Sequence, residues 1–413
     1  MEKNQKETLK MLTPSFSADP SLIVKRGNLP EELYAEIEAS EKVKCLLAGQ
    51  RGMGKTTELQ RLVVLLKGTE ILPIFVQFGA QQNITIPMLI ESMAQKLMEY
   101  VKGKPAKEFN KAFISLKDWF MEEEKEINAE KGIEGATGIG GNIVILRAEG
   151  RVISKKQEKT AKKMIVRKSI LDLIDHFNKL IDKARLAMSK RIVFIVDDVD
   201  KIQEISSIER TFIHSSHFIN KIDSPCIFTV PITYATSNLI RIGSLPYSEL
   251  YRVPAVELFN EKGKKSEPAF EFLKKVFELR MPYNPIPNEM LEIILEHSGG
   301  VLIDAMRMIR GICRRCILKP NLKVDKYIIE EEFQKLVDDY QFVLDNRIYW
   351  EKISNICKAK DKKIIMTDDM LADLLYKMIV IEYREEKLRF DLHPAVRRLY
   401  EKNAEIIDYF LKQ

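Results

Sequence analysis

A glycine-rich segment at residues 49–57, GQRGMGKTT, constrains the fold of this chain more than any other feature. A short apolar run at residues 45–48 precedes it, and the helix-like ELQRLVVLLK follows it. The segment fits the pattern GxxxxGK[ST] with a strand and a helix at the expected places. Glycines are needed because successive backbone N–H groups must point inward to hold phosphates, and the N-terminus of the next helix adds partial positive charge. We therefore predict a phosphate-binding loop, or P-loop, between a buried strand and a helix.

Every residue of the P-loop is a candidate for nucleotide contact. The candidates are Gly49, Gln50, Arg51, Gly52, Met53, Gly54, Lys55, Thr56 and Thr57. Within this pattern Lys55 reaches the outer phosphates, and the hydroxyl of Thr56 is placed on magnesium.

A second apolar run, at residues 192–196, ends in two carboxylates, Asp197 and Asp198. A continuous apolar run is typical of a parallel strand that is buried on both faces. Acids at the carboxyl end of such a strand face the crevice in which open α/β sheets bind ligands. We therefore expect this strand to be a Walker B strand facing the P-loop.

Three further apolar runs, at 71–78, 226–230 and 251–258, complete the strands of an α/β fold, with helical patterns between them. Pro73 and Pro254 make the first and last of these better suited to the edges of the sheet. Thr229 is the polar residue near the end of its strand. Its hydroxyl is either a contact for the γ-phosphate or the attacking water, or simply the side chain of a residue with high β-propensity.

The spacing of the elements predicts four units along the chain. They are an N-terminal segment (1–40), a P-loop core (41–262) with an insertion at about 79–190, a helical lid (263–334) and a C-terminal domain (335–413). The C-terminal domain has two short strands around a charged turn, preceded and followed by helices, which favours a winged helix.

Charge leaves nucleic-acid binding open. The chain has a net charge of +6, and residues 151–168 hold eight basic residues against one acid. That segment suits a phosphate backbone, an acidic protein or a solvated helix face. The helix expected at 367–377 has three acids against one base, which argues against reading DNA in the major groove and favours packing against protein.

The cysteines and the hydropathy pattern exclude two other classes of protein. Five cysteines, an odd number, imply no disulfide framework, and the CxxC at 313–316 lacks the further ligands of a zinc site. No run approaches the ~20 apolar residues of a membrane span, and the charged N-terminus is unlike a signal peptide. We therefore expect a cytoplasmic protein with no membrane contact.

Taken in order, these motifs resemble those of the AAA+-related P-loop ATPases of the STAND class, bacterial ATPases with a C-terminal winged helix. The matching segments are GQRGMGKTTEL (49–59), VDDVDK (196–201), TVP (229–231), SGG (298–300), EY (382–383) and HPAVRRL (393–399). The resemblance implies a three-layer αβα sheet of strand order 5-1-4-3-2, followed by the lid and the winged helix.

The resemblance also implies roles for site residues. Lys55 binds the phosphates of ATP or ADP, Thr56 and Asp197 hold Mg²⁺, Asp198 orients water, and Thr229 is similar to sensor 1. Many AAA+ motors have Asp-Glu where this chain has Asp197-Asp198. Because the shorter carboxylate positions water less effectively, we expect slow hydrolysis of ATP to ADP and phosphate.

The sequence departs from the family pattern at the lid. Relatives often place Arg-Asp where this chain has Ile303-Asp304, so Arg307 is the substitute contact for the nucleotide. An arginine finger stabilises charge on the transferring phosphoryl group. Three arginines are candidates for it: Arg210, Arg241 and Arg252.

The function implied by the resemblance is an ATP-binding switch that controls a homo-oligomer or activates an effector-protein partner. Because STAND-like ATPases often accompany effector proteins, the resemblance also suggests bacterial antiviral defence. The alternative is a DNA-binding initiator or transposition-type AAA+ ATPase that uses residues 151–168 and the winged helix. A third hypothesis is a scaffold that does not hydrolyse ATP and holds it as a structural ligand.

Overall fold

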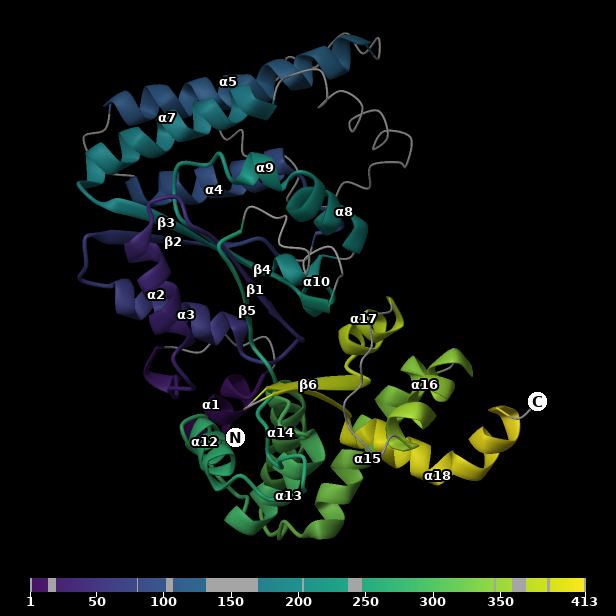
Figure 1. Ribbon diagram of the computed structural model, residues 1–413. Helices are drawn as coiled ribbons and strands as arrows, with labels where there is room; N and C mark the ends of the chain where they lie inside the picture. Colours follow the sequence, from purple (N-terminus) through teal and green to yellow (C-terminus); the bar gives the residue numbers. More distant parts are fainter. Residues whose placement is uncertain are drawn as a thin grey trace.

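The centre of the computed structural model is a five-stranded parallel sheet (Figure 1). The structure describes residues 2–13, 20–79, 81–101, 107–130, 170–202, 204–236, 247–344, 347–358, 369–384 and 387–411. The strands are β1 (Lys44–Gly49), β2 (Ile71–Gln77), β3 (Arg191–Asp197), β4 (Cys226–Pro231) and β5 (Glu249–Arg252). Their order across the sheet is β2-β3-β4-β1-β5, which is 5-1-4-3-2 when counted from the β5 edge.

β2, which contains Pro73, and β5, which Pro254 follows closely, lie at the edges of the sheet, as their sequences predict. The strand predicted at 251–258 is nevertheless wrong in its bounds, since β5 begins at Glu249 and ends at Arg252. Val253 still donates its N–H to Ala48 O, at 2.8 Å. Pro254 has no N–H, so the ladder ends there.

Helices cover both faces of the sheet, which explains why the central strands β1, β3 and β4 are almost entirely apolar and buried (Figure 1). On one side lie α2 (Leu29–Ala39) and α3 (Lys55–Leu66), and on the other lie α4 (Ile86–Val101) and α7 (Ile170–Met188). α5 (Lys107–Glu130) packs on the outer side of α7. Of the predicted insertion at 79–190, α4 and α7 therefore belong to the layer that covers the sheet. The basic segment 151–168 lies outside the described residues.

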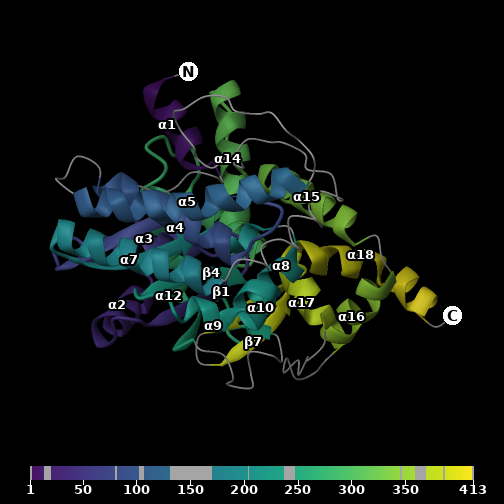
Figure 2. The ribbon, with the colours of Figure 1, turned by 90° about the horizontal axis from the view of Figure 1, so that it is seen from above.

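Short elements follow β3 and β4 along the chain. They are η2 (Val199–Lys201), α8 (Ile205–Glu209), η3 (Arg210–His214), α9 (Ser216–Ile219) and α10 (Ile232–Thr236). Before the sheet come α1 (Lys3–Met11) and η1 (Pro20–Leu22). α1 packs beside α14 (Leu302–Leu318) of the predicted helical lid, which Figure 2 shows from above. The N-terminal segment thus contacts the lid, far from it in sequence.

After the sheet the chain is mainly helical. The helices are α12 (Glu267–Glu278), α13 (Asn288–Ser298), α14 (Leu302–Leu318), α15 (Lys326–Val343), α16 (Arg347–Lys358), α17 (Asp369–Tyr376) and α18 (Pro394–Leu411). Between α17 and α18 lies an antiparallel pair, β6 (Val380–Arg384) and β7 (Leu388–Leu392).

α15 packs against α13, α14 and α18, so it joins the lid to the C-terminal helices. The boundary predicted at 334/335 falls within α15 and stays a prediction. α17, the acidic helix, packs against α10 of the sheet domain. Cys313 and Cys316 are buried within α14 as unpaired thiols. Among the described helices, none is long and apolar enough to cross a membrane.

Candidate nucleotide-binding site

The P-loop joins β1 to α3 at the carboxyl edge of the sheet. Gly52 and Gly54 have positive φ angles of 75° and 94°, a conformation that favours glycine, and α3 begins directly after them at Lys55. A Cβ atom on Gly52 would lie 2.3 Å from the side chain of Ile303. The glycines of the motif therefore serve both the turn and a close contact with the lid.

Lys55 is buried, with 6% of its side chain exposed, and its ammonium group is fully occupied. It donates to Gly49 O at 2.7 Å and to Gln50 O at 2.9 Å. It also pairs with the carboxylate of Asp200 at 2.9 Å. These three acceptors match the three N–H donors of an ammonium group.

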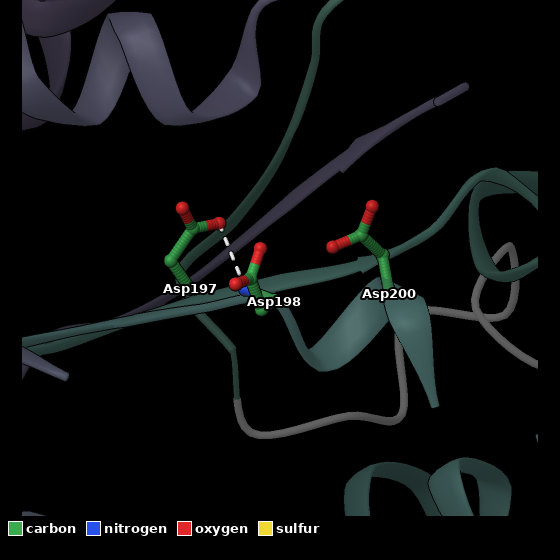
Figure 3. Close-up of side chains that lie close together, drawn as sticks. All are labelled: Asp197, Asp198 and Asp200. Atoms are coloured by element: carbon green, nitrogen blue, oxygen red, sulfur yellow. Dashed lines mark hydrogen bonds between the residues drawn. The ribbon is translucent and has the colours of Figure 1, made fainter. Parts of the chain in front are cut away.

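Three carboxylates gather at the end of β3, those of Asp197, Asp198 and Asp200, with ligand atoms within 4.8 Å of one another (Figure 3). The sequence predicts the first two but misses Asp200, although it is the third acid of VDDVDK. Asp198 has a positive φ of 70°, which aspartate tolerates, and this turn starts the short helix η2 that carries Asp200. The side chain of Asp198 pairs with Lys201 at 2.6 Å. Two lysines thus oppose three carboxylates.

Asp197 is the carboxylate best suited to a metal ion. Burial raises its pKa, as does the charge of Asp198, while a hydrogen bond with the Thr56 side chain lowers it. Its Oδ1 accepts the N–H of Asp198 at 2.8 Å, and its buried Oδ2 has no hydrogen-bond partner among the described residues. A buried, unpartnered carboxylate oxygen beside a threonine hydroxyl fits the oxygen ligands that Mg²⁺ prefers. The structure thus brings Thr56 and Asp197 together, as a shared magnesium ion requires.

Thr229 lies beside this acidic turn, on β4. It is fully buried, and its Oγ1 accepts the N–H of Val199 at 3.2 Å. The hydroxyl therefore fixes η2 to the sheet, and its own proton is still available for donation.

The lid reaches the P-loop through apolar side chains and not through an arginine. Ile303 packs on Gly52 and Leu302 lies near Gly54. Arg307, predicted to contact the nucleotide, is half exposed and pairs with Asp339 on α15 at 2.6 Å. In this conformation its guanidinium is directed to α15.

Asp304 follows Ile303 on α14 and contacts the C-terminal domain. It is buried, and its Oδ2 lies 3.2 Å from Nε2 of the buried His393. His393 opens the HPAVRRL segment, so this contact joins the lid to the C-terminal domain.

Two of the three arginine-finger candidates have partners within the described part of the chain. Arg210 pairs with Glu204, and Arg252 pairs with the buried Glu382 at 2.6 Å. Arg241 lies outside the described residues.

The side chain of Gln50 contacts the C-terminal domain. It is 3% exposed, and its amide donates to Leu375 O at 2.8 Å and to Val380 O at 2.7 Å. Its Oε1 accepts the N–H of Glu382 at 2.8 Å. The neighbouring Arg51 lies over the ring of Tyr376, 5.7 Å from its centroid. Sequence patterns did not predict these contacts, since the partners follow more than 300 residues later.

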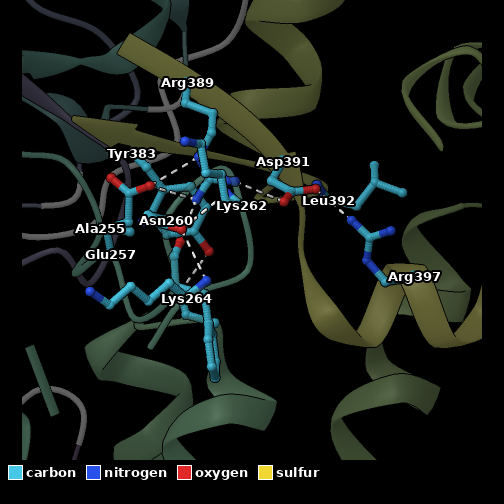
Figure 4. A network of polar contacts seen from close by, with 12 residues as sticks. Ala255, Glu257, Asn260, Lys262, Lys264, Tyr383, Arg389, Asp391, Leu392 and Arg397 are labelled. Carbon is cyan, nitrogen blue, oxygen red and sulfur yellow. Dashed lines mark hydrogen bonds and ion pairs between the residues drawn. The ribbon is translucent and has the colours of Figure 1, made fainter. Parts of the chain in front are cut away.

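A second polar contact holds β7 to the segment after β5 (Figure 4). Arg389 is 6% exposed and pairs with Glu257 at 2.8 Å and with Asp391 at 2.9 Å. Asp391 also bonds Arg397 of α18. The C-terminal hairpin is therefore attached to the sheet domain both at the P-loop and at this ion-pair cluster.

The chain matches no protein-family model and no curated protein sequence. Among solved structures it is similar to the Walker-type ATPase PABY2304 of Pyrococcus abyssi, with 14% identity and a TM-score of 0.46, covering 95% of this chain and 99% of that chain. It is also similar to Cdc6p from Pyrobaculum aerophilum, with 10% identity and a TM-score of 0.39, covering 95% and 98%. It is similar to a structure of Drosophila ORC bound to DNA as well, with 9% identity and a TM-score of 0.42. That match covers 96% of this chain and 91% of the ORC chain. Identities this low and TM-scores below 0.5 do not assign the chain to a family.

Proposed function

We propose that this protein is an ATP-binding, slowly hydrolysing switch of the AAA+ and STAND type, which controls the assembly or activation of a partner. The observation that supports it most directly is the meeting of Lys55, Thr56 and Asp197 at the carboxyl edge of a parallel sheet. Lys55 would hold the phosphates, and Thr56 with Asp197 would hold Mg²⁺. Bound magnesium would neutralise charge on the outer phosphates.

Asp198 is the reason to expect slow ATP hydrolysis. Its carboxylate pairs with Lys201, and it is shorter than the glutamate of many motors, so it is poorly placed to orient an attacking water. The bound nucleotide, more than its turnover, would then decide which conformation is populated.

The switching part of the proposal is supported by the contacts of the C-terminal domain with the P-loop. The Gln50 side chain forms hydrogen bonds with three backbone groups of that domain. A change in the conformation of the P-loop would therefore move or break contacts with the C-terminal domain. We propose a P-loop core at 41–262, a lid at 263–334 and a winged-helix domain at 335–413. The partner is a second copy of this chain or an effector protein. A role in bacterial antiviral defence is proposed only because the motifs resemble those of STAND ATPases.

The test is the particle mass by light scattering with magnesium and either ADP or a non-hydrolysable ATP analogue. We expect a larger particle in the ATP form only. The control is a Lys55→Met/Asp200→Asn variant, which removes the phosphate-binding charge without leaving a buried carboxylate unpaired. If this variant assembles as the wild type does while binding no nucleotide, the switch proposal fails.

The second candidate function is a DNA-binding initiator-type ATPase, which the eight basic residues of segment 151–168 favour. One of the similar solved structures is Drosophila ORC bound to DNA, but this second function is proposed because of the basic segment. Binding to random duplex that weakens with salt, and that is lost when Lys155, Lys156, Lys162 and Lys163 become Glu, would support it. Unchanged binding in that variant would refute it.

A further inference from the structure

Asp200 occupies the position on Lys55 that a nucleotide phosphate needs. The ammonium group has three N–H donors, and three acceptors already use them: two P-loop carbonyls and the Asp200 carboxylate. The carbonyl oxygens belong to Gly49 and Gln50, within six residues of Lys55, and the loop itself holds them in place. Asp200 is the acceptor that comes from another element, and it is the charged one.

We propose that Asp200 acts as an internal competitor of the nucleotide, holding Lys55 in the empty site until a phosphate group replaces its carboxylate. The proposal rests on the proposed function, because it concerns the same phosphate site. Both partners are 6% exposed, so water screens the pair little and a bound anion must displace the carboxylate to reach the ammonium group.

The displaced Asp200 carboxylate could move toward the carboxylates of Asp197 and Asp198. Asp200 sits on the short helix η2, and one of its oxygens already lies within 4.8 Å of one oxygen each of Asp197 and Asp198. Bringing a third carboxylate fully into this group is unfavourable by itself, because like charges repel at short range. The three carboxylates would hold a magnesium ion brought by the nucleotide, and its charge would offset this repulsion. Asp200 is thus a positioning residue: it selects for a ligand that delivers phosphate and divalent cation together.

The test measures the affinities for ADP and for a non-hydrolysable ATP analogue by calorimetry, each with and without Mg²⁺. Asp200→Asn keeps the shape and still accepts a hydrogen bond, but it removes the competing charge. We expect it to tighten binding about tenfold, the effect of losing one charge-assisted hydrogen bond in the empty site. The gain should be largest without Mg²⁺, and adenosine, which has no phosphate, should bind no better than to the wild type.

The matched control is Asp198→Asn, which removes the same charge from the same cluster but from a carboxylate that pairs with Lys201. A gain in Asp200→Asn that exceeds the gain in Asp198→Asn supports the competition. Equal gains in the two variants, or none in Asp200→Asn while the wild type binds nucleotide, overturn it and leave the proposed function standing. If wild type and Asp200→Asn both bind no nucleotide, the proposed function fails and the competition fails with it. Thermal unfolding of each variant verifies that it is folded.

Discussion

Variants at Lys55 test two properties independently: the stability of the protein without nucleotide, and its affinity for nucleotide. In Lys55→Met the apolar stem of the side chain is kept, but Asp200 becomes a buried carboxylate without its partner. Breaking a buried ion pair on one side costs about 3–5 kcal/mol, because the remaining charge is desolvated and uncompensated. For a unit the size of the P-loop core, each kcal/mol corresponds to about 2–4 °C of melting temperature, so a loss of 3 kcal/mol means about 6–12 °C.

The double variant Lys55→Met/Asp200→Asn removes both charges. We expect it to recover most of the lost melting temperature, because a neutral amide is less costly to bury than a carboxylate. It should still bind no nucleotide. The assay is thermal unfolding without nucleotide, followed by circular dichroism, together with titration of a fluorescent ATP analogue. If Lys55→Met melts within about 1 °C of the wild type, or if the double variant is no more stable than the single one, the buried ion pair does not have the energetic role argued from its burial.

Two further predictions concern the metal and the lid. Because burial raises the pKa of Asp197, its carboxylate is protonated at a higher pH than an ordinary aspartate, and only the charged form binds metal well. The contribution of Mg²⁺ to nucleotide affinity should therefore fall with decreasing pH already above the usual aspartate range near about pH 4. Calorimetry across pH measures it, and an equal pH dependence in Asp197→Asn would contradict the assignment. Gly52→Ala should lower the melting temperature more than Gly68→Ala, since both residues have positive φ but only the Cβ at Gly52 meets a neighbour, Ile303. Equal decreases in melting temperature in the two variants would show that Ile303 does not pack tightly against Gly52.

Much of the fold follows from local patterns in the sequence. The spacing of GxxxxGK[ST] between a strand and a helix predicts the P-loop, and two apolar runs that end in polar residues predict β3 and β4. Pro73 suits β2 to an edge, because a strand that lacks an N–H in its middle cannot pair fully on both sides, and Pro254 ends the ladder after β5. The extent of β5 differs from the local pattern, because it depends on pairing with β1, which is distant in the sequence.

The amino-acid sequence by itself determined which residues carry charge and hydroxyl groups at the carboxyl edge of the sheet: Lys55, Thr56 and Asp197. Only the tertiary structure decided what these groups contact. The left-handed turn at Asp198 directs Asp200 onto Lys55, and Gln50 bonds a strand 332 positions later in the chain. Such contacts depend on how separately folded segments pack together. A sequence motif records the spacing of neighbours along the chain, whereas these partners are neighbours only in space.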